Sequence, residues 1–175
     1  MKTSIENLQK ISGLSGIKAN ERGDAAVFVR TEMDADDNNY KSNLFLLRQG
    51  EICQLTSGGE ESSFVFEDND NLLFSAARSK KEKEAGESGL SETTYYRIST
   101  KGGEAVKAFT LPLNVSKLEA LGDGKFLILA DISQNNTELF AKSREERIDY
   151  AKKKKDDSFA LEAEEIPFWF NGAGF

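Results

Sequence analysis

Residues 43–56 read NLFLLRQGEICQLT and have the pattern of a β-hairpin. Asn43–Arg48 is a short, largely apolar strand, and Glu51–Thr56 has the length and composition of its partner. Between them, Gln49-Gly50 is typical of a two-residue turn, because glycine accepts the positive φ that such turns require. The sequence therefore predicts antiparallel β-structure in this part of the chain.

The same unit recurs further along the chain. Gly103 follows Gly50 by 53 positions, and in both places a glutamate comes next and opens a strand that ends in threonine, at Thr110 and Thr56 respectively. Repeats of about 40–50 residues, each built from about four short strands, are typical of β-propeller blades. We therefore predict an all-β fold, a partial β-propeller.

Further apolar runs complete the repeat. The other predicted strands are Ala25–Arg30, Ser63–Phe66, Leu72–Arg78, Thr94–Ser99, Glu104–Thr110, Ser116–Leu121 and Lys125–Asp131. Two polar stretches, Glu32–Lys41 and Ser79–Glu92, are predicted as loops, where added length costs little. The chain is then one partial propeller domain, residues 1–175, of about three four-stranded antiparallel blades: about 18–60, 61–113 and an incomplete third at 114–175.

Two segments have helical rather than strand patterns. Ser4–Ile17 carries apolar residues at three-residue spacing and ends in glycines, which predicts a short N-terminal helix. Ser143–Ala151 predicts a second helix, because Ser143 and Glu146 have the spacing of a capping box. Together with the lysines that follow, it forms a helical insertion near 143–155 in the third blade.

Histidine is absent from all 175 residues. A Ser-His-Asp triad, a Cys-His pair and most zinc sites need an imidazole, and the sequence also lacks the Gly-x-Ser-x-Gly turn of α/β-hydrolases. The chain is therefore predicted to be non-catalytic. No residue is assigned as catalytic, cofactor-binding or metal-binding, and an independent esterase or metal enzyme is disfavoured.

Three charged or reactive features have a functional and a structural interpretation, and the structural one is favoured for each. Asp34–Asn38 resembles a calcium loop, but Asn39 and Phe45 stand where an EF-hand needs Gly and Glu. Lys152–Lys155 is flanked by aspartates and is interpreted as a solvated helix end. Cys53 is predicted to be an inert, partly buried thiol.

Charge, apolar content and cysteine count restrict the partners and the compartment. The formal net charge of −7 disfavours nucleic acid, because a polyanion is repelled. No run of about 18 apolar residues occurs, so no membrane partner is predicted. A single cysteine cannot form an internal disulfide, which fits a reducing cytoplasm.

Several short motifs resemble the start of the N-terminal propeller of prolyl oligopeptidase-family serine peptidases, in particular the bacterial acylaminoacyl-peptidase-like members. They are Ser4–Leu8, Ser42–Leu46, Gln54–Thr56, Phe74–Arg78 and Glu165–Gly172. The resemblance implies a downstream α/β-hydrolase domain that carries the triad, and a propeller that restricts access to small peptides. No site residue of the family is matched in this sequence.

Two functions fit these observations. The first is a truncated, non-catalytic propeller segment of a serine peptidase that hydrolyses short peptides, gating access to a hydrolase domain in the same protein. An incomplete ring of blades exposes strand edges, so this hypothesis also predicts self-association of the isolated chain and a reading frame that continues past Phe175. The alternative is a stand-alone propeller-like module that binds a protein or peptide.

Overall fold

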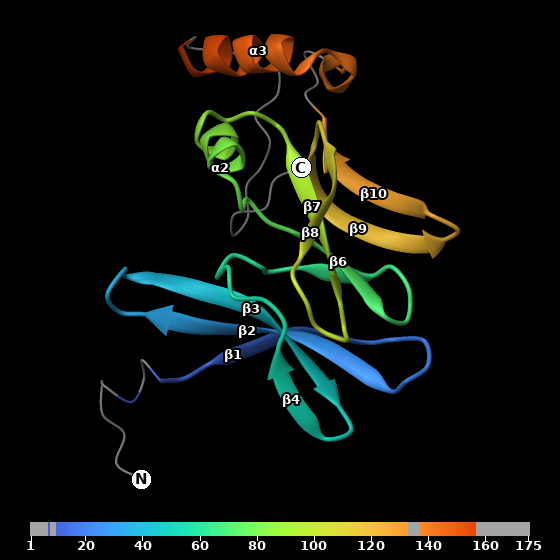
Figure 1. The fold of residues 1–175 in the computed structure, drawn as a ribbon. Coiled ribbons are helices and arrows are strands. Elements are labelled where there is room, and N and C mark those ends of the chain that lie inside the picture. Colours follow the sequence, from blue (N-terminus) through green and yellow to red (C-terminus); the bar gives the residue numbers. More distant parts are fainter. Residues whose placement is uncertain (1–6, 8–9, 133–136, 157–175) are drawn as a thin grey trace, which may run out of the picture.

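Ten strands in the described part of the chain form three antiparallel sheets that follow one another in sequence (Figure 1). This computed structural model describes residue 7 and residues 10–132 and 137–156. The first sheet contains β1 (Gly13–Ala19), β2 (Ala25–Asp34), β3 (Asn39–Arg48) and β4 (Glu51–Gln54). The second contains β5 (Phe64–Phe66), β6 (Asn71–Ser75), β7 (Thr93–Ser99) and β8 (Val106–Leu111), and the third contains β9 (Asn114–Gly122) and β10 (Lys125–Asp131).

In each sheet, strands that are consecutive in sequence are hydrogen-bonded neighbours. This is the order of a propeller blade, so the predicted partial propeller of four-stranded antiparallel blades is confirmed. The predicted hairpin around Gln49-Gly50 is confirmed as well: Arg48 pairs with Glu51. Gln49 and Gly50 have φ values of 52° and 82°, as a turn with two left-handed residues requires.

The second sheet is buried on both faces, and this determines how the three sheets are arranged. Successive side chains of a strand point to opposite faces, so Leu72 and Phe74 of β6 face the first sheet and Leu73 faces the third. All three are 0% exposed. The cluster shared with the first sheet is Ala25, Val27, Val29, Leu44, Leu46, Phe64, Leu72, Phe74, Tyr96 and Ile98; the one shared with the third is Val65, Leu73, Tyr95 and Leu118.

The predicted loop at Ser79–Glu92 was wrong, because it contains the helix α2 (Lys80–Glu87). The Ser79 hydroxyl accepts a hydrogen bond from the Glu82 backbone N–H at 3.2 Å, and the Glu82 carboxylate accepts one from the Ser79 N–H at 2.9 Å. This is a capping box, which fixes the start of the helix. Ala85 is buried against the sheet, so α2 also has an apolar anchor.

The predicted loop at Glu32–Lys41 is much shorter than expected, because β2 and β3 continue beyond their predicted ends. What remains is a short turn after Asp34. The Asp34 carboxylate accepts hydrogen bonds from the backbone N–H groups of Asp36 (3.1 Å) and Asp37 (3.3 Å), and it contacts the ammonium group of Lys41. A local polar turn thus closes a long hairpin, where composition alone predicted irregular structure.

The predicted N-terminal helix, Ser4–Ile17, was wrong for its last five residues, which belong to β1. There Leu14 pairs with Arg30 of β2. Backbone pairing with the free edge of β2 outweighs the weak helical pattern, and Gly16 accepts the positive φ of 62° at the irregular point of the strand. Before Gly13, only residue 7 and residues 10–12 are described.

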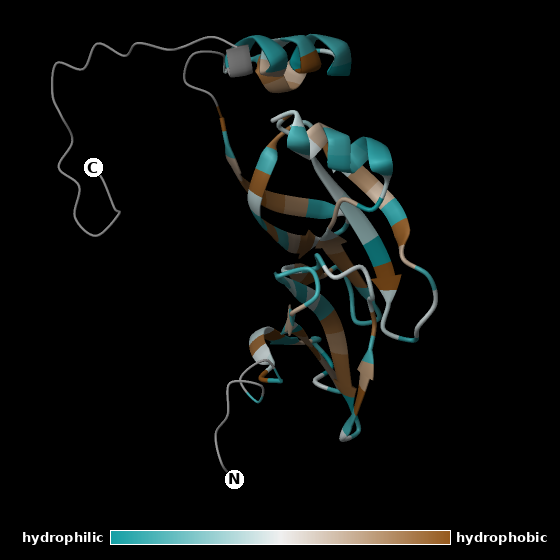
Figure 2. Ribbon diagram, turned by 90° about the vertical axis from the view of Figure 1, so that its left-hand side faces the viewer, coloured by the Kyte–Doolittle hydropathy of each residue, from teal (hydrophilic) through white to brown (hydrophobic). Residues whose placement is uncertain are grey.

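The second predicted helix is confirmed as α3 (Arg144–Asp156), which follows a short 3₁₀ turn, η1 (Leu139–Ala141). Ser143 caps it: its hydroxyl accepts from the Glu146 N–H at 3.3 Å, and its own N–H donates to the Glu146 carboxylate at 2.9 Å. In Figure 2 the hydrophobic segments lie on the strands, whereas α2 and most of α3 are hydrophilic. The motif Glu165–Gly172 lies outside the described residues.

Candidate functional site

The connections between strands lie at the two opposite ends of the strands, and therefore along two opposite sides of the sheets (Figure 1). One side, which we call the hairpin edge, carries the turns β1–β2, β3–β4, β5–β6, β7–β8 and β9–β10. The other side, which we call the helix edge, carries the β2–β3 turn, the β4–β5 connection, and the connections that contain α2 and α3. Antiparallel order alone produces this separation within each sheet.

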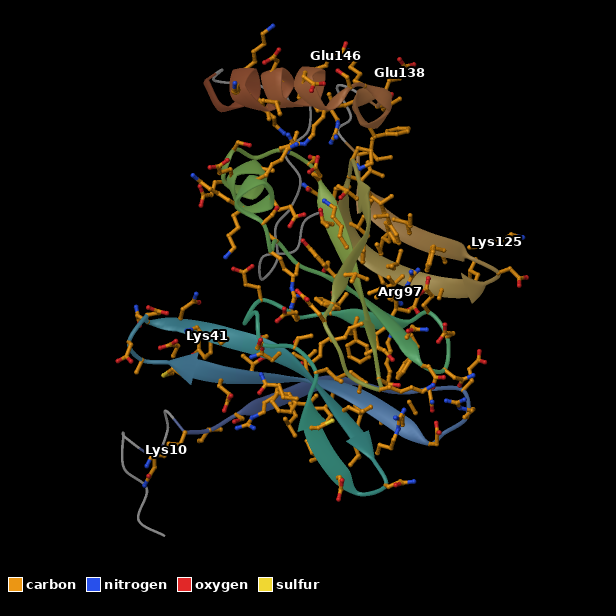
Figure 3. All side chains as sticks on the ribbon, viewed as in Figure 1. Lys10, Lys41, Arg97, Lys125, Glu138 and Glu146 are labelled. Carbon is orange, nitrogen blue, oxygen red and sulfur yellow. The ribbon has the colours of Figure 1, made fainter. Side chains whose placement is uncertain are left out.

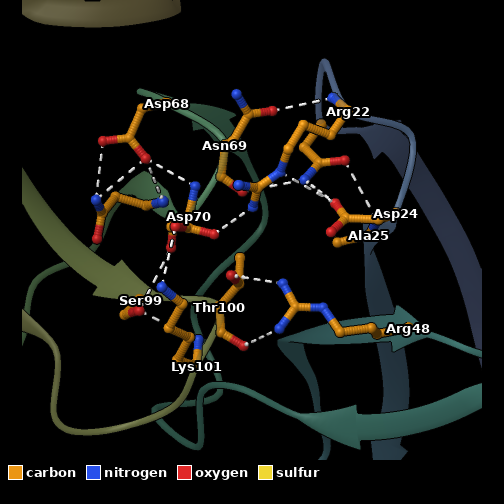
Figure 4. A network of polar contacts seen from close by, with 12 residues as sticks. Arg22, Asp24, Ala25, Arg48, Asp68, Asn69, Asp70, Ser99, Thr100 and Lys101 are labelled. Atoms are coloured by element: carbon orange, nitrogen blue, oxygen red, sulfur yellow. Dashed lines mark hydrogen bonds and ion pairs between the residues drawn. The ribbon is translucent and has the colours of Figure 1, made fainter.

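The hairpin edge carries a polar network that joins the first and second sheets (Figure 4). Arg22 donates to one oxygen of Asp70 at 2.6 Å, and Lys101 donates to the other at 3.1 Å. These two hydrogen bonds, with that of Lys101 the larger cause, hold the pKa of Asp70 below its usual value. Asn20, which is buried, donates to the backbone oxygen of Asn69 at 3.1 Å. The network ties neighbouring turns together and has a structural role.

At the helix edge, a buried carboxylate lies between the first and second sheets. Glu61 is 0% exposed, and its Oε1 is 3.4 Å from the Arg78 guanidinium. Arg78 in turn lies over the rings of Phe74 and Tyr96, with its central carbon 5.4 and 5.3 Å from their centroids. Gly58 makes room for the carboxylate, because a Cβ at that position would be 2.3 Å from Glu61 Oε1.

Glu82, in the first turn of α2, is the most strongly perturbed acid in the described residues. Burial alone raises its pKa, but hydrogen bonds from the Ser79 backbone, from Tyr96 and from Lys107 lower it to about 2. The Tyr96 hydroxyl donates to Oε2 at 2.7 Å, and the Lys107 ammonium donates to Oε1 at 2.9 Å. Burial and then Glu82 raise the pKa of Tyr96 to about 12. Glu82 therefore stays ionised, and it fastens α2 to β7 and β8.

A second acid, Glu92, fastens α3. Its Oε2 accepts from Arg144 Nε at 3.1 Å and from an Arg147 terminal nitrogen at 3.3 Å. The other terminal nitrogen of Arg147 donates to the backbone oxygen of Ser91 at 3.0 Å. The side chains of Arg147 and Glu92 are each only 9% exposed, whereas that of Arg144 is 28% exposed. One carboxylate thus serves two guanidinium groups.

Between α2, β8 and α3 lies an open cleft of about 380 Å³, which we call the cationic cleft. Its charged lining residues are Lys81, Lys107, Lys142, Arg144, Arg147, Glu82 and Glu92. Its remaining walls are Ser79, Thr110, Pro112 and Phe140. Five positive groups therefore surround a space that two carboxylates line, in a chain whose formal net charge is −7.

A different groove, of about 200 Å³, runs along the first strand of each sheet: β1, β5 and β9. Gly16, Ser62, Ser63 and Ser116 are among its lining residues, so parts of its wall have small side chains. Lys18 of β1 reaches Glu119 of β9 at 3.5 Å, past the three-residue strand β5. In a propeller the first strands of the blades surround the central channel, so this groove corresponds to part of the channel wall.

The three features that the sequence singled out lie on different elements: the β2–β3 turn, β4 and α3. Cys53 is exposed on β4, contrary to the partly buried thiol that was predicted. Cys53 pairs with Leu46, which faces the second sheet, but β4 is the outer strand of its sheet and all four of its residues are exposed, which explains the error. Lys152, Lys153 and Lys154 are exposed in the last turns of α3. The Asp34 turn binds Lys41, and the described residues contain no group of acids, cysteines or histidines that could hold a metal ion.

Comparison with solved structures places this arrangement among peptidase propellers. The chain superposes on acylaminoacyl peptidase from Pyrococcus horikoshii with a TM-score of 0.60 over 100% of its length, at 14% identity. An acylaminoacyl peptidase in complex with Z-Gly-Gly-Phe-chloromethyl ketone gives 0.58 over 97%, at 14% identity. The propeller domain of the trilobed protease from Pyrococcus furiosus, described as having an open velcro topology, gives 0.50 over 69%, at 15% identity.

This chain spans 23% and 22% of the two peptidase chains and 34% of the trilobed-protease domain. No protein-family model and no curated protein matches its sequence. None of the helices in the described residues is long and apolar enough to cross a membrane. At these identities the comparisons establish the fold: the chain has the structure of a β-propeller segment like those of acylaminoacyl peptidases.

Proposed function

We propose that this chain is the N-terminal propeller segment of a serine peptidase of the prolyl oligopeptidase family that hydrolyses short peptides. Its role is to gate substrate access to an α/β-hydrolase domain elsewhere in the same protein. The observation that carries the proposal is the superposition on acylaminoacyl peptidases over 97–100% of the chain. We assign residues 18–60 and 61–113 to two blades and 114–175 to part of a third, and we place the protein in the cytoplasm because its one cysteine is unpaired.

The exposed apolar residues of the third sheet support further blades as intramolecular partners. Leu127 and Leu129 share one face of β10 and are 62% and 64% exposed, and Leu121 near the end of β9 is 64% exposed. The equivalent residues of the second sheet are buried by a neighbouring sheet. Another blade on this face would remove the apolar surface from water. In its absence, the same surface would favour self-association of the isolated chain.

The groove along β1, β5 and β9 supports the gating role. The parts of this wall with small side chains leave room for an extended peptide, and a closed ring of blades would exclude folded chains. The Lys18–Glu119 pair crosses this wall, at side-chain exposures of 41% and 37%. The groove contributes selection by size, while the hydrolase domain supplies the nucleophile, the base and the oxyanion stabilisation.

The test begins with the native protein. Intact-mass measurement and sequencing of the locus should find more blades, followed by Gly-x-Ser-x-Gly, an acid and a histidine in that order. In the full-length protein, kcat/KM for peptides should fall steeply as the peptide becomes longer. A nitrophenyl ester, which is small enough to pass the channel, should be hydrolysed in every case. Replacing both Lys18 and Glu119 with alanine should raise kcat/KM for longer peptides and leave the ester rate unchanged.

A native protein without a hydrolase domain would refute the peptidase proposal. It would favour the stand-alone module that binds a protein or peptide, for which the cationic cleft at the helix edge is the specific supporting observation. If the hydrolase domain is present but kcat/KM is independent of peptide length, the gating role is wrong.

A further inference from the structure

The cationic cleft has more positive charge than its own acids neutralise. Glu82 and Glu92 are both largely buried and already bound: Glu82 by Tyr96 and Lys107, and Glu92 by two arginines. Their carboxylates are therefore not available to further cations. With five cations and two carboxylates in the lining, a surplus of three positive charges faces the cleft.

Several donors in the cleft are not used by the described residues. Lys81 is exposed on α2, and no acid among the described residues pairs with its ammonium group. Arg147 is 7% exposed and its terminal nitrogens already donate to Ser91 and Glu92, so it contributes charge to the cleft and not a free donor. Lys142 is exposed and has only a long-range interaction with Glu146, which lies on the outer side of α3 in Figure 3. The positive charge of Lys81 and Lys142 is therefore left for an anion to neutralise.

The shape of the cleft limits what such an anion can be. A space of about 380 Å³ is within the range of small-molecule sites. The cations come from α2, β8 and the start of α3, so they surround one volume and do not form a flat strip. Guanidinium groups bind phosphate oxygens in pairs, and ammonium groups contribute charge at the rim. Phe140, 44% exposed, and Pro112 provide an apolar wall for an attached organic group.

We infer that the cationic cleft binds a small oxyanion of the phosphate class that carries two or three negative charges. Arg144 holds its oxygens from the α3 side with the charge of buried Arg147 behind it, Lys107 holds them from β8, and Lys81 and Lys142 close the rim. The ligand is either free phosphate or the phosphate group of a small organic molecule. This site is independent of the peptidase proposal, because it lies at the helix edge, away from the groove along β1, β5 and β9.

Isothermal titration calorimetry on the full-length protein tests this inference with inorganic phosphate, pyrophosphate, adenosine monophosphate and citrate as probes. Binding should weaken as ionic strength rises from about 0.02 M to about 0.15 M, because the rim lysines are exposed. Replacing Lys81 and Lys142 together with alanine should weaken pyrophosphate binding by about tenfold or more. Tighter binding of adenosine monophosphate than of phosphate identifies an organic phosphate as the ligand, and equal binding identifies the free ion.

The matched control replaces Lys125 and Lys152 with alanine. These lysines are exposed and lie outside the cleft, and replacing them removes the same charge from the protein as replacing Lys81 and Lys142. Pyrophosphate affinity in this control should stay within about twofold of the original protein. The inference is overturned if no phosphate-class probe binds at millimolar concentration, if the two double variants weaken binding equally, or if citrate binds more tightly than pyrophosphate. Binding is read without any peptidase assay, so this outcome is separate from that of the proposed function.

Discussion

Replacing Glu92 with glutamine should release α3 from the helix edge without unfolding the sheets. The substitution keeps the size of the side chain and removes the charge that Arg144 and Arg147 share. Breaking a buried ion pair from one side costs about 3–5 kcal/mol, because the remaining charge is left without compensation. Arg144 is 28% exposed and stays partly solvated, and the glutamine still offers one acceptor, so we expect a loss of about 2–3 kcal/mol.

This loss should be local, because α3 has few other attachments. Arg147 is its one buried side chain among those that the structure describes. A cost of about 2–3 kcal/mol raises the population of the detached helix by about 30- to 150-fold. Hydrogen exchange of the α3 amides should accelerate by that factor, while exchange in β6 should not change. Trypsin should also cut faster after Lys152, Lys153 and Lys154.

Glu87→Gln is the matched control. Glu87 is exposed at the end of α2, and no ion pair with another described residue involves it, so the substitution makes the same charge change without touching α3. Its exchange and trypsin profiles should match those of the original protein. If α3 exchanges no faster in Glu92→Gln than in Glu87→Gln, the ion pairs do not hold the helix. If β6 accelerates equally, the helix and sheets unfold as one unit.

Three further predictions concern stability. The lowered pKa of Glu82, about 2 in the folded protein, makes ionised Glu82 stabilising by about 3 kcal/mol at pH 7. Urea titrations should therefore show the largest difference in unfolding free energy between the original protein and Glu82→Gln above pH 5, and a smaller difference as the pH falls toward 2. A difference that does not change with pH would contradict this. Gly58→Ala should cost about 1–3 kcal/mol by displacing Glu61, whereas Gly86→Ala, with nothing within 4 Å, should be neutral or stabilising. Phe74→Ala should cost about 3–5 kcal/mol, against less than about 1 kcal/mol for half-exposed Phe140→Ala; similar losses would show that β6 is not the centre of the core.

The strands could be predicted from the sequence because each is determined mainly by its own residues. Asn43–Arg48 is apolar and bounded by a glycine turn, and its pairing partner follows at once. Such local patterns gave the all-β class and the repeat. They also gave the capped start of α3, since Ser143 and Glu146 are only three positions apart.

The helix edge could be predicted only in part. The capping signal of α2, Ser79 followed by Glu82, was present in the sequence, but the high charge of the segment was interpreted as a loop. The ion pairs of Glu92 could not be foreseen, because Arg144 and Arg147 lie more than 50 positions further along the chain. Only the packing of α3 over the second sheet brings them together. The burial of Glu61 likewise depends on how two separate sheets meet.

The two edges of these sheets are under different physical constraints, and this explains where new function can arise. At the hairpin edge the turns are short, and Asp70 binds both Arg22 of the first sheet and Lys101 of the second, so a change in one turn disturbs its neighbour. At the helix edge the connections lie outside the strand ladders, so they can lengthen without altering strand register. Helices α2 and α3 and the cationic cleft occur at that edge. A repeated fold can thus keep its core and still acquire a binding site, provided that the added helices are fastened by buried acids such as Glu82 and Glu92.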